Sequence, residues 1–251
     1  MTEKLLKGKT ILVTGGTRGI GKAIALHAAD LGANLVVTYR DPAKKARADE
    51  LAKEAATRGV AILIERTDIT EEADRTRLFE QIKARFGSLD GLILNAAGGL
   101  EADKGPDYPM LINRDAQLAL VQAGRDLMPV GSWAIYMTSL WAHRYGELES
   151  LPGYGPVALT KHQAETDLRS MIPALAESQI KLGIVVGHLI EGTGAYIIFK
   201  RKSKAMIEQL TQEVVGGKLP SSQDVAQATL EFFTQPTWPS GHTVFVGEVA
   251  E

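Results

Sequence analysis

The sequence contains no cysteine. This absence excludes disulfide bonds, thiolate catalysis and cysteine-ligated metals, and it fits a reducing compartment. No apolar run approaches the roughly 18 residues needed to span a bilayer, and residues 1–7 lack the continuous apolar segment of a signal peptide. These absences predict a cytoplasmic protein with no metal site and no membrane partner.

The sequence also has no large excess of either positive or negative charge. Lys and Arg number 28 against 30 Asp and Glu, so nothing favours binding to nucleic acid. The one dense basic cluster, at residues 200–204, fits an exposed helix face. A length of 251 residues with 45% hydrophobic content suits one large globular domain over residues 1–251.

What the chain does have is a regular alternation of short apolar runs and longer segments of helical period. The runs are rich in Val, Ile and Leu without polar alternation, which is typical of parallel strands covered on both faces. This α/β pattern predicts a doubly wound parallel sheet with helices on both faces and ligands at the carboxyl ends of the strands. Strands are expected at 10–14, 34–39, 60–66, 91–95, 133–138, 181–187 and 243–246, and helices near 20–31, 42–58, 71–86, 110–128, 156–177 and 222–234.

A glycine-rich turn, TGGTRGIG at residues 14–21, follows the first strand and leads into a helix. Glycines let backbone N–H groups approach a pyrophosphate, and the helix N-terminus adds partial positive charge. The glycine spacing is Gly15-x-x-x-Gly19-x-Gly21. We therefore expect a dinucleotide at this turn.

The second strand is predicted to end at Tyr39, which puts Arg40 next to the adenosine ribose. Arg40 and Arg18 are two guanidinium groups that favour the 2′-phosphate of NADP(H) over NAD(H). Asp41 would reverse this preference if the strand ended one residue later. After the third strand, Asp68 and the adjoining Ile69 offer an acceptor for the adenine amino group.

These segments together resemble the short-chain dehydrogenase/reductase family. The shared motifs are the T-G-x-x-x-G-x-G turn, an N-A-A-G tetrapeptide at residues 95–98 and the aspartate after the third strand. The resemblance covers nearly the whole chain and implies a Rossmann-type sheet of about seven strands, a nicotinamide lying across the strand ends, and a homodimer or homotetramer. The cofactor contacts expected are Gly15, Thr17, Arg18, Gly19, Ile20, Gly21, Arg40, Asp68, Ile69, Asn95, Ala96, Ala97, Lys161 and Thr193.

The family typically uses Asn, Ser, Tyr and Lys in catalysis. The resemblance assigns these roles to Asn113, to Ser139 (with Thr138 as its nearest competitor) and to Lys161. The residue four positions before the lysine, where the family has its tyrosine, is Val157, which cannot transfer a proton.

The nearest tyrosine, Tyr154, is seven residues before Lys161, about 10.5 Å along a straight helix. Pro156 suits a first helical turn and should hold Gly155 extended, which leaves Tyr154 outside the helix and able to fold back. We predict that Tyr154 replaces the missing tyrosine. Tyr145, His143 or a water held by the lysine are the alternative proton donors.

A second departure follows the sixth strand, where the family usually has Pro-Gly. Here Thr193 could bond the nicotinamide carboxamide, and His188 could reach the substrate or be structural. The combined departures resemble an atypical bacterial branch of the family. Residues 194–220 fall where the family has a mobile lid, and their apolar content suggests an apolar or aromatic substrate.

The function predicted is an NADP(H)-dependent oxidoreductase that transfers a hydride between nicotinamide and a carbonyl or secondary alcohol. A ketoreductase is the favoured form. The alternative is a non-catalytic NADP(H)-binding sensor or partner protein, motivated by Val157. The substrate, the physiological direction and the subunit number do not follow from the sequence.

Overall fold

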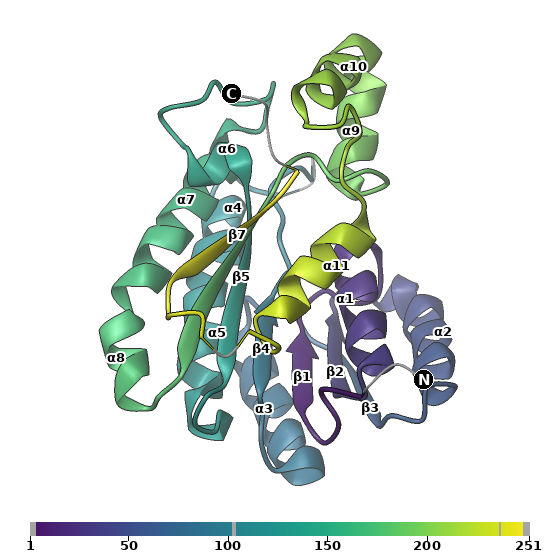
Figure 1. The fold of residues 1–251 in the computed structure, drawn as a ribbon, viewed down its shortest axis with the longest axis vertical. Coiled ribbons are helices and arrows are strands. Elements are labelled where there is room, and N and C mark those ends of the chain that lie inside the picture. The colour runs from purple at the N-terminus through teal and green to yellow at the C-terminus, as the bar shows by residue number, and fades with distance from the viewer. Residues whose placement is uncertain (1–3, 102–103, 236, 248–251) are drawn as a thin grey trace.

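The computed structural model describes residues 4–101, 104–235 and 237–247. Seven parallel strands form one sheet in the order β3-β2-β1-β4-β5-β6-β7 (Figure 1). The order reverses between β1 and β4, so the carboxyl ends of these two strands flank the switch point where such sheets bind ligands. The strands are β1 (Thr10–Val13), β2 (Asn34–Tyr39), β3 (Ile62–Arg66), β4 (Gly91–Leu94), β5 (Trp133–Ser139), β6 (Lys181–Gly187) and β7 (His242–Val246).

Helices cover both faces of the sheet, which confirms the doubly wound α/β prediction. Because the central strands are buried on both sides, each face carries its own apolar core. One face packs against α1 (Gly19–Asp30), α2 (Lys45–Ala56) and α11 (Ser222–Glu231). The other packs against α3 (Glu72–Phe86), α5 (Ala116–Gly124), α7 (Gly155–Ser170) and α8 (Ile172–Glu177).

Three of the expected helices are divided. The segment predicted as 42–58 begins with a 3₁₀ turn, η1 (Pro42–Lys44), and continues as α2. The segment predicted as 110–128 consists of α4 (Tyr108–Met110), a π-helical turn η2 (Leu111–Asp115), α5 and a 3₁₀ turn η3 (Arg125–Leu127). The segment predicted as 156–177 breaks between α7 and α8, where Pro173 lies in the first turn of α8. A proline there lacks the N–H that would continue the preceding helix.

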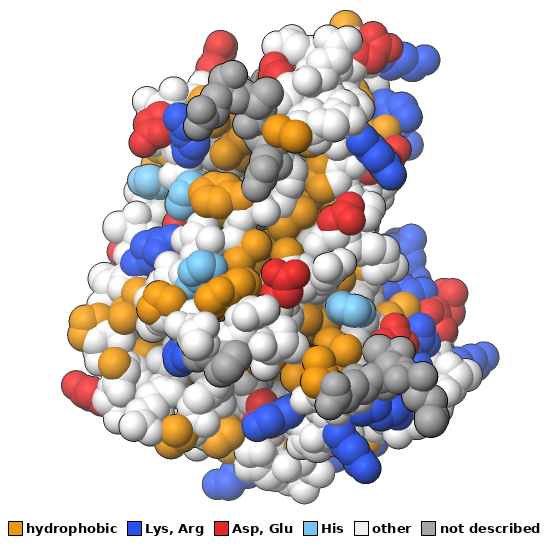
Figure 2. All heavy atoms as spheres, viewed as in Figure 1, with side chains coloured by type: hydrophobic (Ala, Val, Ile, Leu, Met, Phe, Trp, Pro, Cys, Tyr) orange, Lys and Arg blue, Asp and Glu red, His pale blue; other side chains and the backbone are white. Residues whose placement is uncertain are grey.

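Two further helices, α9 (Gly194–Lys202) and α10 (Lys204–Glu213), extend beyond the carboxyl ends of the strands (Figure 1). Together with the short α6 (Leu140–His143) and the start of α7 they share a third apolar cluster. Figure 2 shows the face of the molecule that is drawn in Figure 1, and hydrophobic side chains gather in its middle, around β7 and the base of α9. Among the described residues, no helix has the length and apolar character needed to cross a membrane.

Candidate active site

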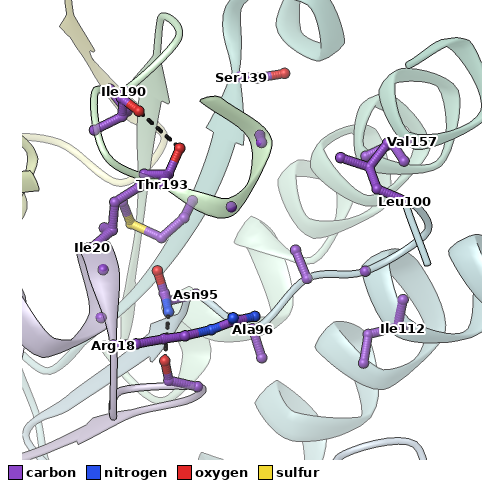
Figure 3. Close-up of a pocket in the computed structure, with 18 of the residues that line it drawn as sticks. Arg18, Ile20, Asn95, Ala96, Leu100, Ile112, Ser139, Val157, Ile190 and Thr193 are labelled. Atoms are coloured by element: carbon purple, nitrogen blue, oxygen red, sulfur yellow. Dashed lines mark hydrogen bonds between the residues drawn. The ribbon is translucent and has the colours of Figure 1, made fainter. Parts of the chain in front are cut away.

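A cavity of about 1070 Å³ follows the carboxyl ends of the strands. Its α1 end is lined by the glycine-rich turn and by residues after β2 and β3. Its α9 end is lined by residues of α6, α7 and α9. Figure 3 shows Arg18 and Ile20 on the side of the glycine-rich turn, Ser139 at the end of β5, and Val157 with Leu100 on the opposite wall.

The glycine-rich turn at the α1 end has the geometry that its sequence predicts. Gly15 and Gly19 have φ angles of +64° and +52°, which only glycine adopts readily. A Cβ atom on Gly21 would lie 2.6 Å from the Asn95 side-chain nitrogen. Since Arg18 forms no side-chain cap at the start of α1, the first N–H groups of the helix stay available to an anion.

Asn95 holds this turn against the neighbouring strand. Its Nδ2 donates to the carbonyl oxygens of Thr14, at 2.8 Å, and of Gly15, at 3.4 Å. Its own N–H donates to the Thr14 hydroxyl at 3.0 Å. Asn95 therefore fixes the floor of the cavity, and Ala96 and Ala97 continue its wall as predicted.

Four basic side chains line the α1 end of the cavity, two more than we predicted. β2 ends at Tyr39, as expected, so Arg40 rather than Asp41 is the first residue beyond it. Lys44 and Arg47, at and beyond the short η1 turn (Pro42–Lys44), complete the set with Arg18. The basic character of residues 44–47 was a usable signal, because this segment follows β2 directly.

Arg40 also reaches across the cavity. It donates a hydrogen bond to the Tyr108 hydroxyl, and its guanidinium carbon lies 5.4 Å from the centroid of that ring. Its Nη2 is 4.0 Å from a Glu101 carboxylate oxygen. Residues of the segment after β4 thus contact the residue expected to bind a 2′-phosphate.

Asp68 and Ile69 also line the cavity. One Asp68 carboxylate oxygen accepts hydrogen bonds from the Thr70 N–H, at 3.1 Å, and the Thr70 hydroxyl, at 2.7 Å. Asp68 therefore also closes the turn that leads into α3.

At the α9 end, the Tyr154 hydroxyl donates to Ser139 Oγ at 3.0 Å. Both side chains line the cavity. Tyr154 is the N-cap residue of α7, so it lies outside the helix as predicted. The expectation for Gly155 is wrong: the helix begins at this residue, and the glycine with positive φ is Gly153 (+81°). The turn that carries Tyr154 is formed before the tyrosine, which makes a hinge after it unnecessary.

Aromatic rings enclose Tyr154. Its ring centroid lies 6.4 Å from that of Trp141 and 6.1 Å from that of Phe199, both in edge-to-face contact. Burial raises the pKa of the Tyr154 phenol, and the hydrogen bond to Ser139 opposes this rise. A buried neutral phenol can donate a proton, and a nearby cation would be needed to lower its raised pKa.

Lys161 lies in α7 and is buried beneath the same part of the cavity. Its Nζ donates to the Met137 carbonyl at 2.8 Å and lies 5.3 Å from the centroid of the Tyr136 ring. Burial lowers the pKa of the Lys161 amine to about 8. Because this pKa lies close to neutral pH, a bound anion or a nearby phenolate would favour the protonated form of the lysine.

Asn113 lies behind the cavity wall, within the π-helical turn. Its Nδ2 donates to the Gly98 carbonyl at 3.0 Å and to Thr160 Oγ1 at 3.1 Å, and its Oδ1 accepts from the Gly98 N–H at 3.1 Å. Its main-chain carbonyl accepts from the buried Tyr136 hydroxyl at 3.1 Å. Asn113 therefore links the segment after β4 to α7, and Tyr136 is a partner that the sequence analysis missed.

Neither alternative side chain, His143 or Tyr145, lines this cavity. The Nδ1 atom of His143 lies 2.9 Å from a carboxylate oxygen of Glu165, one turn beyond Lys161 in α7. Tyr145 is 39% exposed, with its ring 5.7 Å from that of His162. Val157 does line the cavity, so the position normally held by a tyrosine is occupied by an inert side chain.

Thr193 lines the cavity at the start of α9. Its hydroxyl donates to the Ile190 carbonyl at 2.8 Å (Figure 3). It also accepts from the Tyr196 N–H at 3.3 Å. It therefore caps α9 in this structure. Within the described residues, no cluster of three or more His, Asp or Glu side chains could hold a metal ion.

The chain is similar in sequence and structure to known proteins. The model of a family described as enoyl-(acyl carrier protein) reductase matches residues 15–246. Hydroxynaphthalene reductase-like protein Arp2 of Metarhizium anisopliae is 28% identical over 266 aligned residues, which cover 98% of this chain and 96% of that protein.

Solved structures agree. The promiscuous reductase LugOII, described as catalysing keto-reduction at C1 during lugdunomycin biosynthesis, is 26% identical with a TM-score of 0.80, and 96% of each chain is covered. The angucycline C-6 ketoreductase LanV, solved with bound NADP, is 25% identical with a TM-score of 0.80, covering 96% of this chain and 94% of that one. By its sequence motifs, its sheet and these matches, the chain belongs to the short-chain dehydrogenase/reductase family.

Proposed function

We propose that the protein is an NADP(H)-dependent ketoreductase. The observation that carries this proposal is the hydrogen bond of 3.0 Å between Tyr154 and Ser139 in a cavity that also contacts Lys161. An aligned hydroxyl pair is what proton transfer to a carbonyl oxygen requires. When bound, NADPH supplies the hydride for the carbonyl carbon.

The α1 end of the cavity fits NADP(H). Four basic side chains suit a 2′-phosphate, and the glycine turn with the uncapped start of α1 suits a pyrophosphate. Asp68 and Ile69 border the adenine site, and Asn95, Ala96 and Ala97 border the path to the nicotinamide. The residues assigned to the phosphates are Gly15, Thr17, Arg18, Gly19, Ile20, Gly21 and Arg40.

In the reduction, Ser139 holds the carbonyl oxygen and Tyr154 gives it the phenolic proton as the hydride reaches the carbon. The product is a secondary alcohol, and the tyrosinate regains its proton from water. Lys161 favours the tyrosinate electrostatically and binds the nicotinamide ribose, while Asn113 positions α7. Thr193, at the cap of α9, bonds the carboxamide.

Val157 at the usual tyrosine position supports our assignment of the chain to an atypical bacterial branch of the family, in which Tyr154 acts in place of that residue. The alternative, a protein that binds NADP(H) without turnover, gains no support from relatives whose names denote reductases. Residues 194–220 act as the substrate lid. The chain is a cytoplasmic homo-oligomer that acts on a small apolar or aromatic carbonyl compound.

The test is a Tyr154→Phe variant, assayed by NADPH oxidation with a panel of aryl and alkyl ketones. We expect kcat/KM to fall by about 100-fold or more, because the proton donor is lost while the ring still packs. Tyr145→Phe is the matched control and should retain full turnover, since Tyr145 lies outside the cavity. Full turnover by Tyr154→Phe would refute the assignment of the proton donor, and tight NADPH binding without oxidation on any ketone would refute the function.

A further inference from the structure

His188 is a buried imidazole that the proposed reaction does not use. It follows β6 directly, one residue beyond Gly187, which pairs in register with Ser139. Its side chain is only 5% exposed, and it lines the cavity. His188 therefore follows the strand that pairs with the end of β5, and it shares the cavity wall with Ser139 and Tyr154.

The imidazole has no hydrogen-bond partner among the described residues. Its Nδ1 atom is fully enclosed and unpaired, and so is Oγ1 of Thr138, the neighbour of Ser139 on β5. The other ring nitrogen, Nε2, is not fully buried, and it also has no hydrogen-bond partner among the described residues. Because nearly all buried polar groups in native proteins are satisfied, an unpaired imidazole in a cavity wall indicates a missing partner.

The state of the ring indicates the partner's chemistry. Burial lowers the pKa of His188, while Glu213 of α10 opposes this shift, so the ring is neutral at neutral pH. A buried nitrogen without a partner is less unfavourable as an acceptor than as an N–H donor. We therefore assign the unpaired Nδ1 as the acceptor and place the proton on Nε2. The open nitrogen is thus a neutral N–H donor, suited to a neutral oxygen.

An aromatic ring packs against the imidazole. The Trp141 ring centroid lies 5.0 Å from that of His188, and Trp141 also contacts Tyr154. Leu189 and Phe199 line the cavity nearby. A ligand here meets apolar walls with one polar anchor, the arrangement that fixes the orientation of aromatic ligands.

We propose that His188 forms a substrate subsite that donates a hydrogen bond to a second, non-reacting oxygen on an aromatic ketone. This inference rests on the proposed function and specifies its substrate class as hydroxylated or multiply oxygenated aryl ketones. His188 is a binding residue in this scheme and takes no part in proton transfer.

The first test compares matched substrates on the wild-type enzyme, namely α-tetralone and its ring-hydroxylated derivatives. We expect at least one hydroxylated derivative to have a kcat/KM about 10-fold above that of α-tetralone, since one hydrogen bond is gained by a buried donor. No preference for any derivative would overturn the subsite but leave the ketoreductase assignment standing. Failure to oxidise NADPH with every ketone would count against the function itself.

The second test removes the donor. His188→Phe keeps a ring against Trp141 but has no N–H, and we expect its hydroxylated-to-plain ratio of kcat/KM to fall close to one. His188→Gln, which retains an N–H donor, should recover part of the ratio. His242→Phe is the control, because His242 stacks on Trp238, 4.1 Å away and outside the cavity.

The outcomes separate substrate binding from a structural or cofactor role. A ratio that persists in His188→Phe, or a change confined to the KM for NADPH, would overturn the proposal. If His188→Phe does not fold, the same ratio is measured for His188→Leu, which also lacks the N–H donor, and the wild-type substrate comparison still tests the subsite.

Discussion

The two ends of the cavity are held by different kinds of interaction. At the α1 end, backbone geometry at Gly15 and Gly19 and exposed cations such as Arg18 form the site. At the α9 end, Tyr154 is fixed by ring contacts with Trp141 and Phe199, which come from other helices. The difference teaches that the dinucleotide site is specified locally along the chain, whereas the position of Tyr154, the proposed proton donor, depends on tertiary packing.

The largest effect is expected from Lys161→Met at the α9 end. Methionine fills the same buried space without a charge, so the protein should fold, but it removes the cation that we propose stabilises the tyrosinate form of Tyr154. We expect kcat/KM to fall about 1000-fold in the NADPH oxidation assay. Lys83→Met, on α3 away from the cavity, should retain wild-type kinetics. Equal rates for both variants would show that the α9 end does not depend on this charge.

The same buried lysine gives stability a defined pH dependence. Burial lowers the pKa of Lys161 from 10.5 to about 8, so the unfolded chain binds this proton more tightly than the folded one. Stability should therefore rise as the pH increases from about 8 to 10.5, by up to about 3 kcal/mol. The measurement is urea unfolding of wild type and Lys161→Met across this range. Parallel pH curves for the two proteins would contradict the prediction.

At the α1 end, Arg40→Leu tests whether specificity is set by charge alone. Loss of a charge-assisted contact should weaken NADPH binding about 30-fold while NADH binding changes little. Fluorescence titration of both nucleotides measures the effect. Arg85→Leu is the control, since Arg85 packs over Phe86 outside the cavity. A similar loss for both nucleotides would mean that the contacts of Arg40 with Tyr108 and Glu101 matter more than the 2′-phosphate.

The smallest effect concerns Tyr136→Phe, which removes the hydroxyl bonded to the Asn113 carbonyl. An unsatisfied buried carbonyl should reduce the free energy of unfolding by about 1–2 kcal/mol. Urea denaturation gives this value, and Tyr145→Phe at an exposed position should be nearly neutral. A neutral Tyr136→Phe would indicate that another group satisfies the carbonyl.

The sheet and the α1 end were predictable from sequence because their determinants are local. Apolar runs fixed all seven strands to within about two residues, and the end of β2 at Tyr39 made Arg40 accessible to prediction. The cofactor turn follows from glycine positions alone.

The α9 end was only partly predictable. Tyr154 outside α7 follows from Pro156, but the tight turn at Gly153 and the π-helical turn around Asn113 depend on contacts between distant segments. The contact between Arg40 and Tyr108 could not be predicted from the spacing of residues in the sequence, because these residues meet only after the sheet has formed.

The N-cap position of Tyr154 has a consequence for engineering. A phenol on a helix would keep its place if the cavity were widened, but this ring rests on Phe199 of α9. Shortening side chains of α9 to admit bulkier ketones would therefore also remove packing around Tyr154, the proposed proton donor. Redesign should leave Phe199 intact and vary Ile197 or Ile198, which line the cavity without ring contacts to the tyrosine.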